Sequence, residues 1–312
     1  MHTSFDWKPF VIAWFILILQ HNRASVPVQP ELEHHTRQYS DWSWVPMGEI
    51  AFADSVLAYD PGALGENTGD EPAEPFNNPS NVLGVPDTDT SSVRHLSLGN
   101  GGTVILLFRD NILYDGPGAD LCFWMPDPSP EEAVVFISRD NQTFKRAGTI
   151  SSANPLLDIK GAADPGLFYP IIKIRDNAFQ GELDTPDLGA DIDAVCAINT
   201  CKIHEYSADQ LFKDLSTTLQ EDAERILQPV IRDIQSHQEV QVLIEIHPES
   251  RGSMDFNLLL SQEWARILRD YLQEDLGLDA QFTAVAQAAP SYSYSPVQFI
   301  NGRVQILIQY KP

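Results

Sequence analysis

The sequence contains few cysteines, few basic residues and no long hydrophobic run. Its 312 residues include three cysteines, and 20 lysines and arginines stand against 44 aspartates and glutamates, so the formal net charge is −24. Charge of this sign repels nucleic-acid phosphates, and we therefore expect no nucleic-acid partner. It attracts divalent cations, which makes calcium the first metal to consider, because carboxylate oxygens are among its usual ligands.

The main apolar run is short and lies near the start of the chain. Residues 11–19 read VIAWFILIL and follow Lys8. This length suits the h-region of a signal peptide and is shorter than the ~20 residues of a membrane-spanning helix. We predict that residues 1–25 form a signal peptide or, because Asn22 is not the small residue expected before a cleavage at Ala24, a short N-terminal anchor. Both alternatives imply export to the periplasm, the outer membrane or the cell surface.

The three cysteines are Cys122, Cys196 and Cys201. Cys196 and Cys201 are close in sequence, and we predict that they form a disulfide in an oxidising compartment. The alternative is three buried free thiols.

The first part of the chain has the pattern of a β-sandwich. Residues 26–48 are polar with scattered aromatics and are interpreted as a linker. Residues 49–201 alternate short runs rich in Val, Ile and Phe with clusters of Gly, Pro, Asn and Asp, which is typical of an all-β sandwich. Hairpin signals occur at residues 100–102 (NGG) and 139–141 (RDN).

Residues 202–312 have a different pattern. Apolar residues recur every three or four positions over 208–235 and again over 255–273, which predicts two helices. Strands are expected from near Lys202 and over 240–246, 281–285 and 303–309. The order β-α-β-α-β-β predicts an α+β domain with helices on one face of a mixed sheet. We expect the two domains to meet near residues 199–208, in a linker that is open to proteolysis.

A spaced motif runs through the C-terminal domain without a gap from His247 to Ala265, where the chain reads HPESRGSMDFNLLLSQEWA. Residues 301–304 follow as NGRV. These segments resemble the OmpA/MotB-like family, which holds outer membranes and motors to peptidoglycan. The resemblance covers the whole domain and implies peptidoglycan association.

The resemblance also implies a binding site. The family binds the zwitterionic end of the diaminopimelate in a peptide stem, which needs one anionic and one cationic partner. Glu249 stands at the position of the family's Asp, whereas Trp264 stands at that of its Arg, so the cation is missing. Arg251 is a substitute in the loop, and Asn257 and Arg303 match further motif positions. We therefore expect weakened or altered binding that Trp264→Arg restores.

Several of these residues also have a structural interpretation. Asn257 and Ser261 can cap and orient the second helix, and His247 can be a hydrogen-bonded core histidine. Trp264 can fill the volume of the missing arginine or serve as a stacking platform for a sugar.

The first domain also contains three short sequence segments that resemble those of a known type of domain. Residues 78–87 (NPSNVLGVPD), 115–121 (DGPGADL) and 189–195 (GADIDAV) are similar to phrases in secreted bacterial jelly-roll domains of the galactose-binding-like type. The resemblance implies a carbohydrate-binding module, and many such domains hold one structural calcium. Asp54 and Asp193 are our first candidate ligands, and the alternative is that such aspartates only form turns.

Motifs for catalysis are missing from the sequence, which has no Gly-x-Ser-x-Gly, His-Glu-x-x-His or phosphate loop. We therefore expect a non-catalytic cell-envelope protein. Its OmpA-like domain would associate with peptidoglycan, and its sandwich would act as a recognition or adhesion module for an envelope glycan or another envelope protein. One alternative is a structural or interaction scaffold whose pocket no longer binds peptidoglycan. A glycan-active hydrolase comes after both.

Overall fold

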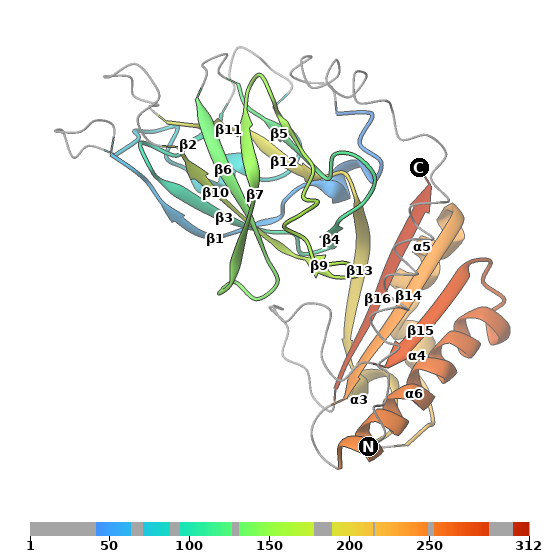
Figure 1. Cartoon of the computed structure of the whole chain (residues 1–312). Helices are drawn as coiled ribbons and strands as arrows, with labels where there is room; N and C mark the ends of the chain where they lie inside the picture. Colours follow the sequence, from blue (N-terminus) through green and yellow to red (C-terminus); the bar gives the residue numbers. More distant parts are fainter. Residues whose placement is uncertain are drawn as a thin grey trace. The chain divides into compact units, whose positions relative to one another are not determined.

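The structure is a computed structural model of the whole chain (Figure 1). It describes residues 42–63, 71–87, 94–126, 131–177, 189–214, 216–248, 253–286 and 302–311. It is rich in β-sheet with few helices and divides into two compact units, with the division between Thr200 and Cys201. Among the described helices, none is both long and apolar enough to cross a membrane. The predicted signal segment 1–25 lies outside the described residues.

The N-terminal unit is built from short antiparallel strands and two short 3-10 helices. In chain order these are η1 (Gly48–Ala51), β1 (Ser55–Asp60), η2 (Pro79–Val82), β2 (Leu96–Ser97), β3 (Thr103–Leu107), β4 (Asn111–Tyr114), β5 (Leu121–Trp124), β6 (Glu132–Ser138), β7 (Phe144–Ser151), β8 (Leu156–Leu157), β9 (Phe168–Tyr169), β10 (Ile171–Asp176), β11 (Asp191–Ile192) and β12 (Ala194–Ala197). One sheet has the order β1-β3-β10-β6-β7 and another the order β12-β5-β8. In addition, β2 pairs with β11 and β4 with β9.

Side chains from the two larger sheets meet in one core. Val104, Ile137 and Ile174 come from the five-stranded sheet, and Phe123 and Val195 come from the three-stranded sheet; all five are fully buried. Burying a side chain of this size contributes roughly 1.5–3 kcal/mol. Two antiparallel sheets that share a core form a sandwich, as the alternating pattern of residues 49–201 predicts.

Of the two predicted hairpins, one is confirmed and one is wrong. The turn at residues 139–141 joins β6 to β7, which pair with each other. The Asp140 carboxylate shapes it by accepting the backbone N–H groups of Gln142 (2.9 Å) and Thr143 (2.7 Å). Residues 100–102 also turn the chain, but the strands on either side do not pair, because β3 lies between β1 and β10.

The chain joins the sandwich earlier than the predicted linker allows. Within the segment 26–48, Val45 and Met47 are buried. Trp44 stacks on Trp124 of β5, with 6.1 Å between the ring centroids. The described end of the segment is therefore part of the sandwich, because its apolar side chains bury surface there.

All three cysteines are buried, and none of them is in a disulfide in the structure. Cys196 on β12 lies directly opposite Cys122 on β5 in the antiparallel ladder, whereas Cys201 lies on the next strand, β13. The structure does not form the predicted Cys196–Cys201 disulfide, because strand pairing holds Cys196 against Cys122.

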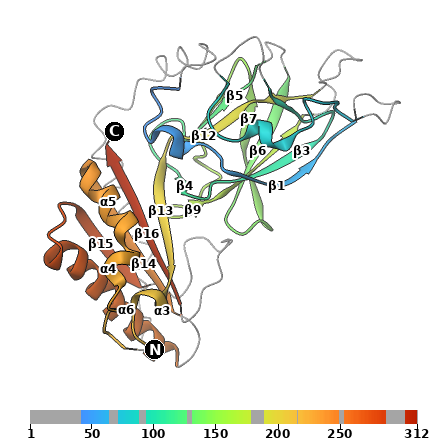
Figure 2. The same cartoon turned by 180° about the vertical axis from the view of Figure 1, so that it is seen from behind.

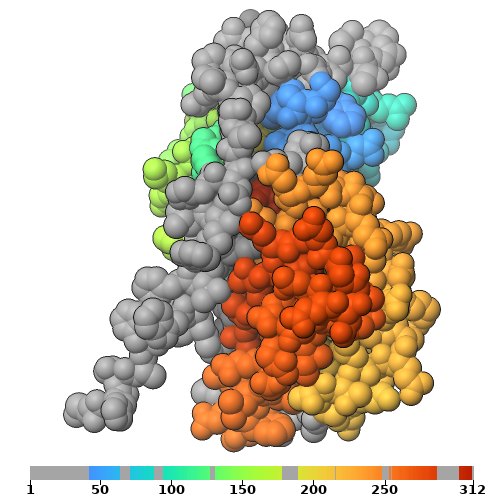
Figure 3. Space-filling view, turned by 90° about the vertical axis from the view of Figure 1, so that its right-hand side faces the viewer, coloured from blue at the N-terminus to red at the C-terminus, as the bar shows by residue number. Residues whose placement is uncertain are grey.

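The C-terminal unit has the predicted order of strands and helices. Its elements are β13 (Thr200–Ser207), α3 (Ala208–Leu211), α4 (Ala223–Ile226), α5 (Gln228–Ser236), β14 (Gln238–Pro248), α6 (Met254–Asp270), a π-helical turn η3 (Tyr271–Asp275), β15 (Gln281–Ala286) and β16 (Gly302–Lys311). Its strands lie side by side in the order β15-β14-β16-β13, and only the β14–β15 pair is parallel. The helices α5 and α6 lie on one face of this sheet (Figures 1 and 2), and Figure 3 shows that helical side, with α6 in orange.

The predicted helix over residues 208–235 is divided into α3, α4 and α5. The chain turns back after α3, and Phe212 pairs with Leu219 across the turn. The Ser216 hydroxyl donates to the Lys213 carbonyl (3.0 Å) and accepts the Thr218 N–H (3.2 Å). Such side-chain bonds compete with the helical ones, which explains why the apolar spacing alone predicts too long a helix.

The predicted linker at residues 199–208 is replaced by a strand. Its residues from Lys202 to Ser207 pair with β16. Asp233 of α5 accepts Lys202 Nζ at 2.9 Å and lies 2.6 Å from His204 Nε2. Burial opposes the charge of Asp233, but these two contacts together lower its pKa. The strand is thus tied to the helical layer as well as to the sheet.

Candidate functional site

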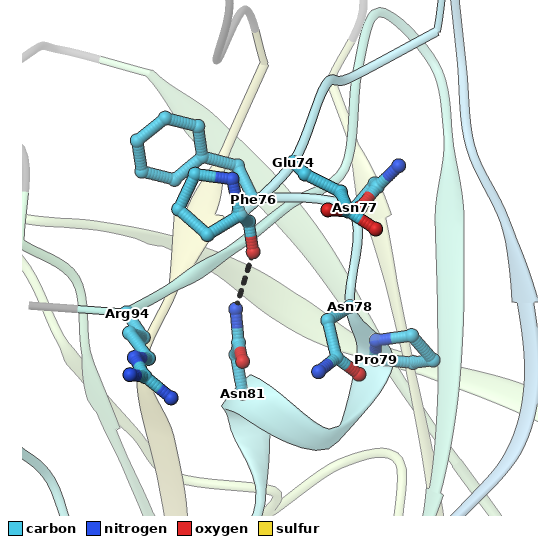
Figure 4. Close-up of a pocket in the computed structure, with 8 residues that line it drawn as sticks. Glu74, Phe76, Asn77, Asn78, Pro79, Asn81 and Arg94 are labelled. Atoms are coloured by element: carbon cyan, nitrogen blue, oxygen red, sulfur yellow. Dashed lines mark hydrogen bonds between the residues drawn. The ribbon is translucent and has the colours of Figure 1, made fainter.

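A pocket of about 700 Å³ opens on the sandwich next to η2 (Figure 4). Its lining residues are Glu74, Pro75, Phe76, Asn77, Asn78, Pro79, Asn81 and Arg94. The lining therefore combines an aromatic ring, three amides, a carboxylate and a guanidinium.

The short helix η2 positions two of the amides. Asn78 is its N-cap, and the Asn78 Oδ1 accepts the Ser80 N–H at 3.1 Å. The Asn81 Nδ2 donates to the carbonyls of Pro75 (2.8 Å) and His95 (3.0 Å). Two segments far apart in the sequence are thereby tied together, and the wall of the pocket is fixed by hydrogen bonds.

Phe76 and Arg94 supply the other contacts. The Phe76 ring stacks on the His95 imidazole at 4.5 Å between centroids and stays half-buried. The Arg94 side chain is exposed, and none of the described residues binds its guanidinium. In the view of Figure 4, Arg94 and Asn78 lie on either side of Asn81. A partly exposed ring with amide and guanidinium donors around it suits a polyhydroxylated ligand, whose C–H face stacks while its hydroxyls form hydrogen bonds.

The motif residues of the C-terminal unit follow β14 into α6. His247 is buried near the end of β14, and its Nε2 lies 3.1 Å from Gln305 Oε1. This placement agrees with the interpretation of His247 as a core histidine. Asn257 lies in the first turn of α6 and is 8% exposed. Glu249 and Arg251 lie outside the described residues.

Ser253 caps α6. The Ser253 Oγ accepts the Phe256 N–H at 3.2 Å. Asn257 and Ser261, the two predicted capping residues, lie inside the helix, and the buried Ser261 hydroxyl has no hydrogen-bond partner within the described ranges. The interpretation of these two residues as caps is therefore wrong.

Trp264 packs in the core of the C-terminal unit. Its side chain is 3% exposed, and its Nε1 donates to the Ser216 carbonyl at 2.7 Å. Its ring stacks on Phe212, with 5.0 Å between centroids and 17° between planes. The structure thus agrees with the packing interpretation, and the buried ring offers no open face to a sugar.

Arg303 on β16 is engaged inside the sheet. It is 6% exposed and forms an ion pair with Glu205 of β13. The Gln305 Nε2 donates to the same Glu205 oxygen at 2.9 Å. The arginine therefore neutralises a half-buried carboxylate, and its own charge, which is largely removed from water, has an ionic partner. Neither Trp264 nor Arg303 supplies a free cation for a ligand.

A second pocket of about 350 Å³ belongs to the C-terminal unit. Its lining residues are Ile234, Gln235, His237, Gln238, Glu239, Gly277, Leu278 and Asp279. It lies at the start of β14, whereas the motif follows the end of that strand, roughly 30 Å away at ~3.3 Å per residue. This pocket and the motif are separate.

The two calcium candidates each accept a backbone N–H from a distant segment of the sandwich. The Asp54 Oδ2 accepts the Arg109 N–H at 2.7 Å, and the Asp193 Oδ2 accepts the Asp87 N–H at 3.0 Å. Within the described residues, neither aspartate belongs to a group of three or more ligating side chains. Both bonds join segments far apart in the sequence, so neither is the local bond of a turn-forming aspartate, and the calcium site stays a prediction.

Three other carboxylates do lie close together, with one oxygen of each within 4.8 Å of the others. They are Asp115, Asp120 and Asp158. The buried Asp120 accepts the N–H groups of Gly116 (2.8 Å) and Ile159 (2.8 Å) and the Asn199 Nδ2 (2.6 Å). Burial raises the pKa of Asp120 to about 7, although these three donors pull it down. Asp120 thus organises the protein's own backbone, and the group carries no metal assignment.

The sandwich pocket was missed from the sequence. The signal was present as the dense polar stretch EPFNNPSN at residues 74–81. This stretch forms a pocket only because it folds into η2 and contacts His95, and a local sequence pattern predicts neither.

No protein-family model matches the sequence, and no curated protein matches it. Solved structures with some likeness include the cell wall anchor of the T6SS from Pseudomonas aeruginosa, at 21% identity and a TM-score of 0.29, over 36% of this chain and 82% of that one. Another is the peptidoglycan-associated lipoprotein from Burkholderia pseudomallei, at 27% identity and a TM-score of 0.27, over 32% of this chain and 87% of that one. A third is the family 32 carbohydrate-binding module of AlyQ in complex with 4,5-unsaturated mannuronic acid, at 14% identity and a TM-score of 0.27, over 46% of this chain and 96% of that one. Likenesses of this size do not assign the chain to a family.

Proposed function

We propose that this chain is an exported, non-catalytic cell-envelope protein, whose C-terminal unit associates weakly with peptidoglycan and whose sandwich recognises a glycan. The observation that carries the proposal is the ungapped motif from His247 to Ala265, which begins on β14 and ends inside α6. The first motif residues lie at the end of β14, and the second half of the motif lies in the capped helix α6.

The glycan-recognition part is supported by the pocket next to η2. The half-buried Phe76 ring and the exposed Arg94 are set around amides that hydrogen bonds hold in place. A ligand would meet a preformed surface and would not need to order it, which reduces the entropic cost of binding.

The scaffold alternative is favoured by two side chains. Trp264 occupies the position of the motif's cation and is buried, and Arg303 is paired with Glu205. A C-terminal unit without a cation in its pocket would keep its fold but would no longer bind the zwitterionic end of the peptide stem.

Peptidoglycan association is tested with the full chain and purified sacculi. We expect co-sedimentation that Glu249→Gln weakens about 10-fold or more, since a hydrogen bond to a charged group is worth about 1.5–3 kcal/mol. Glu274→Gln, at an exposed carboxylate of the same unit outside the motif, is the matched control and should leave sacculus binding unchanged. If the wild-type chain does not co-sediment, the scaffold alternative holds; if Glu249→Gln binds as well as wild type, the motif does not supply the anion.

Glycan recognition by the sandwich is tested separately on an array of envelope glycans. We expect Arg94→Ala to abolish whatever binding the wild-type chain shows. Arg109→Ala is the control, because Arg109 is an exposed arginine of the same unit that does not line the pocket. If both variants lose glycan binding equally, binding depends on the positive charge of the unit and not on the pocket.

A further inference from the structure

Two cysteines far apart in the sequence face each other in the sandwich. Cys122 on β5 and Cys196 on β12 are Cα partners in the antiparallel ladder, and both are fully buried. Directly opposed residues point to the same side of a sheet, with Cβ atoms about 4.5–5.5 Å apart. Their register therefore fixes the two thiols against each other.

Opposed residues in an antiparallel ladder form either hydrogen-bonded or non-hydrogen-bonded pairs. Two residues away from Cys196 and Cys122, the Ile198 N–H donates to the opposed Asp120 carbonyl at 2.7 Å. Pairs of this kind alternate with non-bonded pairs, so Cys122 and Cys196 form a hydrogen-bonded pair, for which the Cα separation is about 5.5 Å. This Cα separation falls within the ~4.4–6.8 Å range of disulfides, and bond formation must also draw the two Cβ atoms together to about 3.5–4.5 Å.

We propose that Cys122 and Cys196 form a cross-strand disulfide when the protein folds in an oxidising compartment, with Cys201 left as a free thiol. Forming the Sγ–Sγ bond removes one hydrogen from each thiol. A disulfide oxidant, such as oxidised glutathione or a thiol–disulfide oxidoreductase, takes up both hydrogens and their electrons and is itself reduced to two thiols. The bond would tie β5 to β12 and close the part of the chain that contains β6 to β11.

Burial determines when the bond can form and how it behaves afterwards. Burial first, and then contact with Cys196, raises the pKa of the Cys122 thiol well above its usual value. A thiol held in the neutral form is a poor nucleophile, so the exchange must take place before the core closes. Once formed, the bond is shielded from reductants in solution.

The test uses the full chain, refolded from denaturant in a glutathione redox buffer, with thiols then counted by maleimide labelling and intact mass in denaturant. We expect one free thiol in the wild type, none in Cys201→Ala, and two in each of Cys122→Ala and Cys196→Ala. Peptide mapping of the wild type without reduction should recover the Cys122–Cys196 link, and this arm does not depend on any variant folding. Three free wild-type thiols, or a wild-type disulfide that contains Cys201, would overturn the proposal.

Reduction kinetics give a second readout. We expect dithiothreitol to open the bond in guanidinium but not in native buffer. Equally fast reduction in both would mean that the bond is not at the buried register position. Glycan and sacculus binding do not enter this experiment, so its outcome is independent of the proposed function.

Discussion

Trp264 is an uncharged core residue at the position where the resembled motif has an arginine. Its ring lies flat on Phe212, and its indole N–H is satisfied by the Ser216 carbonyl. The residue therefore joins α6 to the turn that follows α3. A position that would hold a cation for a ligand has become part of the core.

We expect Trp264→Arg to destabilise the C-terminal unit and not to restore ligand binding. The change removes a stacked aromatic ring and leaves a charge without a partner in the core, at a cost of about 3–5 kcal/mol. Trp264→Phe keeps a ring and loses the hydrogen bond to Ser216, which costs about 1 kcal/mol. Urea unfolding followed by circular dichroism measures both. An arginine variant as stable as wild type would show that residue 264 is outside the core.

At the scale of strands and helices, local pattern predicted most of the elements but only one strand pairing, the β6–β7 hairpin. The strands expected at 240–246, 281–285 and 303–309 are present, with each end within two residues of β14, β15 and β16. The helix expected over 208–235 is divided, because hydroxyl groups in the turn at 213–218 bond to the backbone. Apolar spacing contains no information about such bonds.

The candidate sites were harder to predict because they depend on contacts between distant segments. The register that sets Cys122 against Cys196 is a property of two strands, and Cys201 is nearer only along the chain. In the same way, the pocket needs Asn81 to reach both Pro75 and His95. The motif at His247 could be identified because all of it lies in one continuous stretch.

Asp120 joins three elements, and its titration should be measurable. Its carboxyl accepts donors from the turn before β5, from Ile159 shortly after β8 and from Asn199, which lies between β12 and β13. Burial raises its pKa from 3.8 to about 7, so between these values the folded state binds a proton that the unfolded state has released. The stability that this group contributes is therefore fully present below about pH 4 and is lost as the pH rises through 7.

Comparison with Asp120→Asn isolates this effect, because the amide does not titrate. We expect the difference in unfolding free energy between wild type and variant to shrink by a few kcal/mol between pH 4 and pH 8. Urea unfolding at a series of pH values gives the difference. A difference that does not change with pH would mean that Asp120 titrates as an ordinary exposed aspartate.

For the whole molecule, the main finding is that the two compact units are joined without a linker. The division falls between Thr200 and Cys201, at the start of β13. Domain boundaries usually lie in exposed, flexible segments. Here the backbone just past the division is already hydrogen-bonded in a sheet.

We expect native full-length protein to resist trypsin at Lys202. The residue pairs with Ile308 in the β13–β16 ladder, and its Nζ is bonded to Asp233, so the segment must open before a protease can bind it. Lys160, in an exposed turn, serves as the internal comparison. Fragment masses over a digestion time course should show the cut at Lys160 first. An early cut at Lys202 would mean that β13 frays in solution.

The start of β13 also has a mechanical consequence. If the two units hold different structures of the envelope, any tension between them passes along this strand and reaches the sandwich at Thr200. There the Thr200 Oγ1 donates to the Ile112 carbonyl at 3.0 Å and accepts the Asn111 Nδ2 at 2.9 Å, both inside the core. A pulling force would have to break these buried bonds before it could peel the last residues away from the sandwich. Under such a load, these buried bonds of Thr200 would hold the chain at the point where it leaves its first unit.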